Sequence, residues 1–159
     1  MGILPITLLI LLEYNRSLKR NLKTANEINE NLKSRNIHNN DIDDSPGQIT
    51  ITSETEKEKI EISANQLLFI KSVDNYIEIC WQDQRTIQKE LIRSALKRVK
   101  DLLVDHTYIF QCHRAYIINT QKVDKITGNS QGYKLFLKNT DFEIPVSRSY
   151  SKKLKQILN

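Results

Sequence analysis

The spacing of apolar residues changes near residue 49, and this change constrains the fold more than any other feature of the chain. From there on, apolar and polar residues mostly alternate, as at Ile49 and Ile51 or in the YIEICW segment at 76–81. A period of two places alternate side chains on one face of a strand. We therefore predict short strands near 49–52, 60–62, 67–71, 76–81, 85–89, 108–112, 114–118, 122–127, 133–138 and 142–146.

Two segments after residue 49 have helical spacing instead. Residues 91–103 place seven apolar side chains on one helical face, and residues 149–158 place Tyr150, Leu154, Ile157 and Leu158 on one side. The sequence thus predicts a mainly β domain over residues 49–159. Small antiparallel sheets would carry one inserted helix and a short C-terminal helix, and a further helix or coiled coil would precede the domain.

The N-terminal third is organised differently. Residues 1–12 are almost entirely apolar, and the basic residues Arg16, Lys19, Arg20 and Lys23 follow them. This order resembles the cytoplasmic end of a transmembrane helix, although twelve residues are fewer than the roughly 20 that a span needs. We interpret residues 1–12 as the end of such a helix and expect membrane association through them. The alternative is an exposed apolar leader.

Residues 13–35 predict a polar helix with a thin apolar seam. The spacing alternates between four and three residues, with Asn15 and Asn29 inside the seam, as in a coiled coil that sets its register with buried Asn. The pattern favours a homodimer through residues 13–35, and a single solvated helix is the alternative. Residues 36–48 are rich in Asn, Asp, Ser, Pro and Gly, which predicts a linker.

Charge and cysteine usage narrow the class of protein. The net charge is +5, and residues 108–159 alone carry nine basic against three acidic residues, which suits an anionic partner. Cys80 and Cys112 lie in apolar alternating runs, so we expect buried free thiols in a reducing compartment. The sequence contains no Gly-rich phosphate loop, no metal-spaced cluster and no nucleophile elbow, which argues against an enzyme, a cofactor and a metal site.

Two segments place an Arg at the end of an apolar strand. They are CHRAYIIN at 112–119, which contains Arg114, and IPVSRSY at 144–150, which contains Arg148. The forked guanidinium group of Arg matches guanine O6 and N7 in the major groove and also binds phosphates. Spacing alone is equally compatible with two arginines that cap strands or pair with carboxylates.

Four ordered segments resemble the LytTR DNA-binding domain family, over about residues 49–158. They are the IKSVDNY run, the helix ending in DLL, the HRAYIIN strand and the IPVSRSY segment. The resemblance implies an elongated fold of small antiparallel sheets. It also implies that loops on one side of the domain, rather than a recognition helix, enter the major groove of double-stranded DNA.

The resemblance further implies which residues contact DNA. The positions that carry over are Asn75 or its neighbour Tyr76, Arg114 and Arg148 for bases, and Ser147 and Lys152 for phosphates. His113 could act as a general base, but no nucleophile or substrate pocket accompanies it in the sequence. A structural or phosphate-contacting role is therefore the favoured interpretation.

We therefore predict a bacterial, sequence-specific transcription regulator that recognises DNA with strand-end loops. Many members of the family carry a receiver domain, but the 48 residues before the β-domain are too few for one. The N-terminal pattern instead resembles membrane-anchored members, with a cytoplasmic DNA-binding domain tethered to the inner face of the membrane. The alternative function is an adaptor domain that uses the same β-surface without DNA, although an adaptor has no need of both Arg114 and Arg148.

Overall fold

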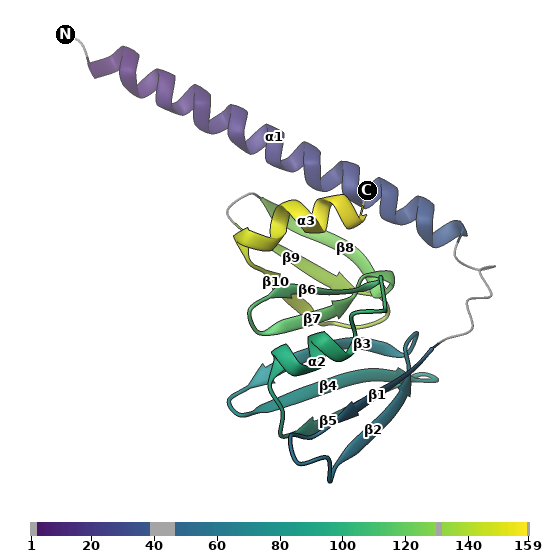
Figure 1. Cartoon of the computed structure of the whole chain (residues 1–159). Coiled ribbons are helices and arrows are strands. Elements are labelled where there is room, and N and C mark those ends of the chain that lie inside the picture. Colours follow the sequence, from purple (N-terminus) through teal and green to yellow (C-terminus); the bar gives the residue numbers. More distant parts are fainter. Residues whose placement is uncertain (1–2, 39–46, 130–131, 159) are drawn as a thin grey trace.

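The computed structural model describes residues 3–38, 47–129 and 132–158, and it stacks three small antiparallel sheets beneath a long helix (Figure 1). The helices are α1 (Ile3–His38), α2 (Leu96–Leu102) and α3 (Arg148–Leu158), with a 3-10 turn η1 (Thr120–Lys122). The strands are β1 (Gln48–Thr52), β2 (Lys59–Ser63), β3 (Leu67–Val73), β4 (Tyr76–Asp83), β5 (Thr86–Ile92), β6 (Ile109–His113), β7 (Tyr116–Asn119), β8 (Val123–Asn129), β9 (Gly132–Leu137) and β10 (Glu143–Val146). This mainly β architecture confirms the predicted fold class.

The central sheet joins segments that are far apart in the sequence. Its five strands follow the order β5-β4-β3-β7-β6, so β3 pairs with both β4 and β7. The second sheet has the order β10-β9-β8, and β1 and β2 form a separate hairpin. Every strand pair is antiparallel.

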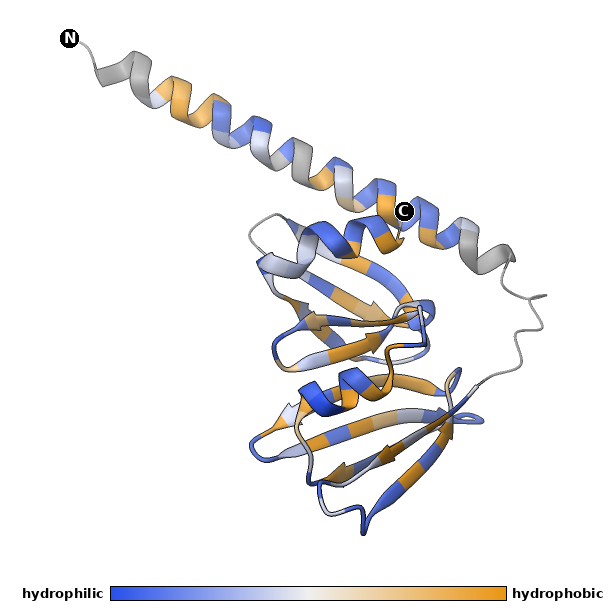
Figure 2. Cartoon of the chain, viewed as in Figure 1, coloured by the Kyte–Doolittle hydropathy of each residue, from blue (hydrophilic) through white to orange (hydrophobic). Residues whose placement is uncertain are grey.

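Both faces of the central sheet are covered, and each face has its own hydrophobic core. One core combines Phe69 and Ile118 of the central sheet with Leu135 of β9 and Leu154 of α3. The other combines the opposite face of the sheet with the β1–β2 hairpin and α2. Burial on both faces explains why β3 begins with four consecutive buried residues instead of alternating. Figure 2 shows the apolar residues gathered between the layers.

The helix predicted at residues 91–103 is shorter than expected. Leu91 and Ile92 belong to β5, which pairs with β4 in the register Ile77↔Ile92, and α2 begins only at Leu96. Leu91 and Leu102 are 55% and 48% exposed, so they do not share the apolar face of α2. Pairing with β4 thus overrides a helical spacing that these residues fit by chance.

Helix α1 runs without interruption across the boundary that the sequence suggested at residue 12, and it includes residues 36–38 of the predicted linker. Residues 39–46 of that linker lie outside the described residues. The C-terminal part of α1 packs on β8 and α3 of the same chain, where Ile28 and Leu32 are buried in a shared core. The described side chains at 7–17 are all exposed. Across the described residues, we find no helix with the length and apolar content that a membrane span requires.

Both cysteines are free and buried, as the sequence predicts. Burial raises the pKa of the Cys80 thiol to about 11 and that of the Cys112 thiol to about 12, against an ordinary value of 9.0. The thiolate is the reactive form of cysteine. The fold therefore lowers the thiolate fraction of both side chains further and buries them away from solvent.

We expect neither thiol to react with a disulfide reagent at pH 8 while the protein is folded, and both to react once guanidinium unfolds it. Because the folded pKa values lie above the unfolded ones, the thiols' contribution to the free energy of unfolding should fall as pH rises above about 9. The absorbance of the thiol released from the reagent gives the number of cysteines that react, before and after unfolding. Rapid labelling of the native protein would contradict the burial of these thiols.

Candidate nucleic-acid interface

The β6–β7 hairpin presents Arg114 at its tip. His113 pairs with Tyr116 across the hairpin, which leaves Arg114 and Ala115 to form the turn. The backbone N–H of Ala115 donates to Nδ1 of His113 at 3.2 Å, so the imidazole closes the turn from inside. Arg114 is exposed, whereas His113 is half-buried with its ring beside that of Tyr116. The geometry gives His113 a structural part in holding this turn.

The junction between β10 and α3 lies directly beside that hairpin. The backbone N–H of Ser147 donates to the carbonyl of Cys112 at 3.0 Å. The Ser147 carbonyl in turn accepts from the backbone N–H of Tyr150 at 3.0 Å and from the hydroxyl of Ser151 at 3.3 Å. Ser147 thus anchors the start of α3 to the end of β6. Arg148, the first residue of α3, is exposed at this junction.

The β3–β4 hairpin lies on the other side of the β6–β7 hairpin. The backbone N–H of Ser72 donates to the carbonyl of Ala115 at 2.9 Å. Val73 pairs with Tyr76, so Asp74 and Asn75 form a two-residue turn in which Asp74 has a positive φ of 52°. Asp tolerates this conformation better than most residues. Asn75 and Tyr76 are both exposed.

Two backbone hydrogen bonds therefore place three sequence-predicted segments in one row. The β6–β7 hairpin is in the middle, and the β3–β4 turn and the start of α3 flank it. All three lie on the left-hand edge of the molecule in Figure 1. Arg114 and Arg148 are both on this edge, and their guanidinium groups can meet a base edge or a phosphate.

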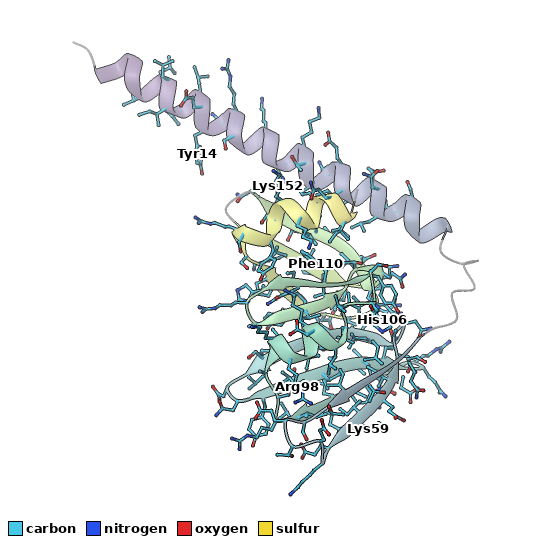
Figure 3. The ribbon with its side chains drawn as sticks, viewed as in Figure 1. Tyr14, Lys59, Arg98, His106, Phe110 and Lys152 are labelled. Atoms are coloured by element: carbon cyan, nitrogen blue, oxygen red, sulfur yellow. The ribbon has the colours of Figure 1, made fainter. Side chains whose placement is uncertain are left out.

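Lys152 is slightly apart from this row. It follows Arg148 by one turn of α3, is exposed, and lies near the start of that helix (Figure 3). Residues separated by four positions share one side of a helix. The structure thus places Lys152 behind Arg148 rather than between the loops.

Arg93 is a basic residue at this edge that the sequence did not single out. It follows Ile92, whose partner is Ile77, so continuing the same register brings Arg93 beside Tyr76. The strand expected at 85–89 in fact continues to Ile92, and its pairing with β4 carries Arg93 to this edge.

The edge is chemically suited to binding and positioning. Its exposed charged side chains include Arg93, Arg114 and Arg148, with Asp74 of the turn and Glu54 beside Arg93 as acidic neighbours. The described residues contain no group of three or more His, Cys, Asp or Glu side chains placed to hold a metal ion. Hydrogen bonding and charge are therefore the means of recognition that this edge offers.

Comparisons with known proteins agree with this geometry. The family model of the LytTr DNA-binding domain matches residues 57–159. A response regulatory protein of Vibrio cholerae, itself uncharacterised, is 33% identical over 88 residues, which are 55% of this chain and 33% of that protein. The transcriptional regulatory protein YpdB of Escherichia coli K12 is 39% identical over 54 residues, which are 33% of this chain and 22% of YpdB.

A solved LytTr DNA-binding domain from Bacillus cereus has a similar fold. It superposes with a TM-score of 0.56 at 18% identity and covers 71% of this chain and 99% of the solved domain. The chain spans a third or less of the length of the two regulatory proteins. The family match agrees with the prediction of a DNA-binding protein rather than an enzyme, and it includes the β3–β4 turn, the β6–β7 hairpin and α3. The chain belongs to the LytTR DNA-binding domain family.

Proposed function

We propose that this protein is a transcription regulator that recognises a specific duplex sequence with the row formed by the β3–β4 turn, the β6–β7 hairpin and the start of α3. The observation that carries the proposal is the pair of backbone hydrogen bonds, Ser72 to Ala115 and Ser147 to Cys112. These bonds hold Arg114 and Arg148 on one rigid edge. Side chains on rigid elements lose less conformational freedom on binding than side chains on free loops.

Within this proposal, the residues divide into two roles. Arg114, Arg148 and either Asn75 or Tyr76 contact bases, because they occupy the exposed tips of the row. Ser147, Lys152 and Arg93 contact phosphates on either side, and the ring of His113 shapes the central turn and can approach the backbone of the duplex. Phosphate contacts set the orientation of a protein on DNA, and base contacts supply specificity.

Replacement of the two arginines should affect specific DNA more than random DNA. A bidentate contact between Arg and guanine discriminates by about 1–3 kcal/mol. Arg114→Ala and Arg148→Ala should each weaken binding to a selected site by about tenfold or more and relax the preference at one base position. Fluorescence anisotropy on a selected and a random duplex measures both effects. Equal losses on the two duplexes, with the fold intact by circular dichroism, would identify phosphate clamps instead.

Replacement of the flanking basic residues should act on all sequences alike. Lys152→Ala and Arg93→Ala should each weaken both duplexes similarly and reduce the slope of log affinity against log salt by about one. Lys59→Ala is the matched control, since this exposed lysine lies on the β1–β2 hairpin, away from the row (Figure 3). If Lys59→Ala changes the slope as much as Lys152→Ala, the assigned face is wrong.

We further propose that the N-terminal half of α1 brings the protein to the membrane surface. The five apolar side chains at residues 8–12 of α1 are between 48% and 62% exposed. Exposed basic residues follow them along the helix. Apolar side chains next to basic ones bind surfaces that contain anionic lipid. In this proposal, the DNA-binding domain works in the cytoplasm beside the membrane.

Leu9→Lys should therefore reduce the fraction of protein that sediments with vesicles containing phosphatidylserine, because it puts a charge in the exposed apolar segment. Asn26→Lys, an exposed position further along the same helix, should leave that fraction unchanged or raise it. Equal sedimentation of the wild type and Leu9→Lys would count against the membrane proposal.

The same half of α1 also supports a proposal of homodimerisation. Leu11, Asn15 and Leu22 continue the seam beyond the docked residues, and all three are exposed. We expect Leu22→Asp to lower the mass measured by sedimentation equilibrium from that of a dimer toward that of a monomer. Asn26→Asp lies off the seam and should not do so. A monomeric wild type at high concentration would exclude this dimer.

A further inference from the structure

One side chain of α1 binds the edge strand β8 of the β10-β9-β8 sheet. The strand at the other edge of this sheet, β10, leads into the start of α3. β8 is the outermost strand of the β10-β9-β8 sheet, so one side of it lacks a neighbouring strand. Asn29 Oδ1 accepts a hydrogen bond from the backbone N–H of Ile126 at 2.9 Å, and Asn29 Nδ2 donates to the carbonyl of Ile126 at 3.2 Å. A single amide thus makes the two hydrogen bonds that a paired strand would make, and it covers an edge that proteins ordinarily protect.

The apolar residues around Asn29 connect α1 to α3 as well as to β8. Ile28 and Leu32 are 1% and 3% exposed. They belong to the same core cluster as Leu154 and Leu158 of α3, and α1 contacts both β8 and α3. Figure 1 shows α3 beside α1, with the C-terminal end of α3 against α1.

The start of α3 forms one end of the row of segments that we propose contacts DNA. Arg148 is its first residue, and Ser147 alone separates α3 from β10. The start of α3 is fixed by Ser147, whereas its last turns are fixed by packing that includes α1. The direction of α3 therefore rests on α1 together with β6 and β9, which also contact this helix.

We propose that Asn29 is a positioning residue for DNA recognition, which holds α1 on β8 so that α3 presents Arg148 in the orientation that recognises a base. The inference rests on the proposed function, and it extends that function to a helix that lies outside the residues matched by the family model. Coupling between two sites is reciprocal, so specific DNA must in turn tighten the docking of α1.

The test compares two alanine variants in the full chain. Asn29→Ala removes both hydrogen bonds to Ile126, and Asn26→Ala makes the same change at an exposed position three residues earlier. Hydrogen exchange reports α1, α3 and the central sheet separately, and anisotropy reports the affinity for a selected and a random duplex. A second variant, Ile28→Asn, disrupts the docking through the apolar contact instead.

We expect Asn29→Ala and Ile28→Asn to exchange faster in α1 and α3, with the central sheet still protected. Both should lose about tenfold in affinity for the selected site and less for random DNA, whereas Asn26→Ala should match the wild type. Selected DNA should also slow exchange in α1 of the wild type.

Three results would overturn the proposal. If α1 undocks in these variants and the affinity for the selected duplex is unchanged, the helix does not position α3 for DNA binding. If the affinity rises instead, the docked helix obstructs DNA binding. Unchanged protection of α1 in Asn29→Ala would show that this side chain does not hold the helix. If the wild-type chain selects no site at all, the proposed function itself fails, and that result is distinguishable because it requires no variant.

Discussion

The β6–β7 hairpin is the element on which the rest of the interface depends. The Cys112 carbonyl at its first strand receives the N–H of Ser147, and the Ala115 carbonyl at its turn receives the N–H of Ser72. Because both bonds are made by backbone atoms, they are independent of which side chains occupy the tips. Substitution of the exposed side chains at the tips should therefore leave the loops in place.

The burial of the central sheet explains why the loops emerge on a common edge. Two cores cover the sheet, one under the β1–β2 hairpin and α2, the other under the three-stranded sheet with α1 and α3. With both faces occupied, the ends of the strands and the exposed edge strand β5 remain available for a ligand. Antiparallel pairing of β3 with β7 puts the β3–β4 and β6–β7 turns at one end of the sheet. The bond from Ser147 adds the end of β10 there.

Sequence pattern predicted the β-domain because alternation is a local property that short strands retain wherever they pair. It also singled out the segments of the proposed interface, since Arg114 and Arg148 each follow an apolar strand within a motif that resembles the family. It could not predict their proximity, which depends on hydrogen bonds between residues 43 and 35 positions apart, Ser72 with Ala115 and Cys112 with Ser147. It misplaced Leu91 and Ile92 because a seven-residue strand contributes apolar residues that also fit a helical spacing.

The seam of α1 shows the same limit in another form. Its spacing correctly indicated an apolar face, but spacing does not specify what covers that face, and part of it packs on β8 and α3 of the same chain. Asn29 also acts differently here from an Asn in a coiled-coil seam, because its amide binds the backbone of β8. Apolar contacts alone would tolerate a shift of α1 along β8, because one buried aliphatic side chain can replace another. The amide of Asn29 matches the N–H and carbonyl of one residue, Ile126, so a shifted helix would lose both hydrogen bonds. A single polar side chain in an apolar seam thus fixes where α1 lies on the domain. Because α1 is one continuous helix, the position of its docked half also sets the direction of its exposed half.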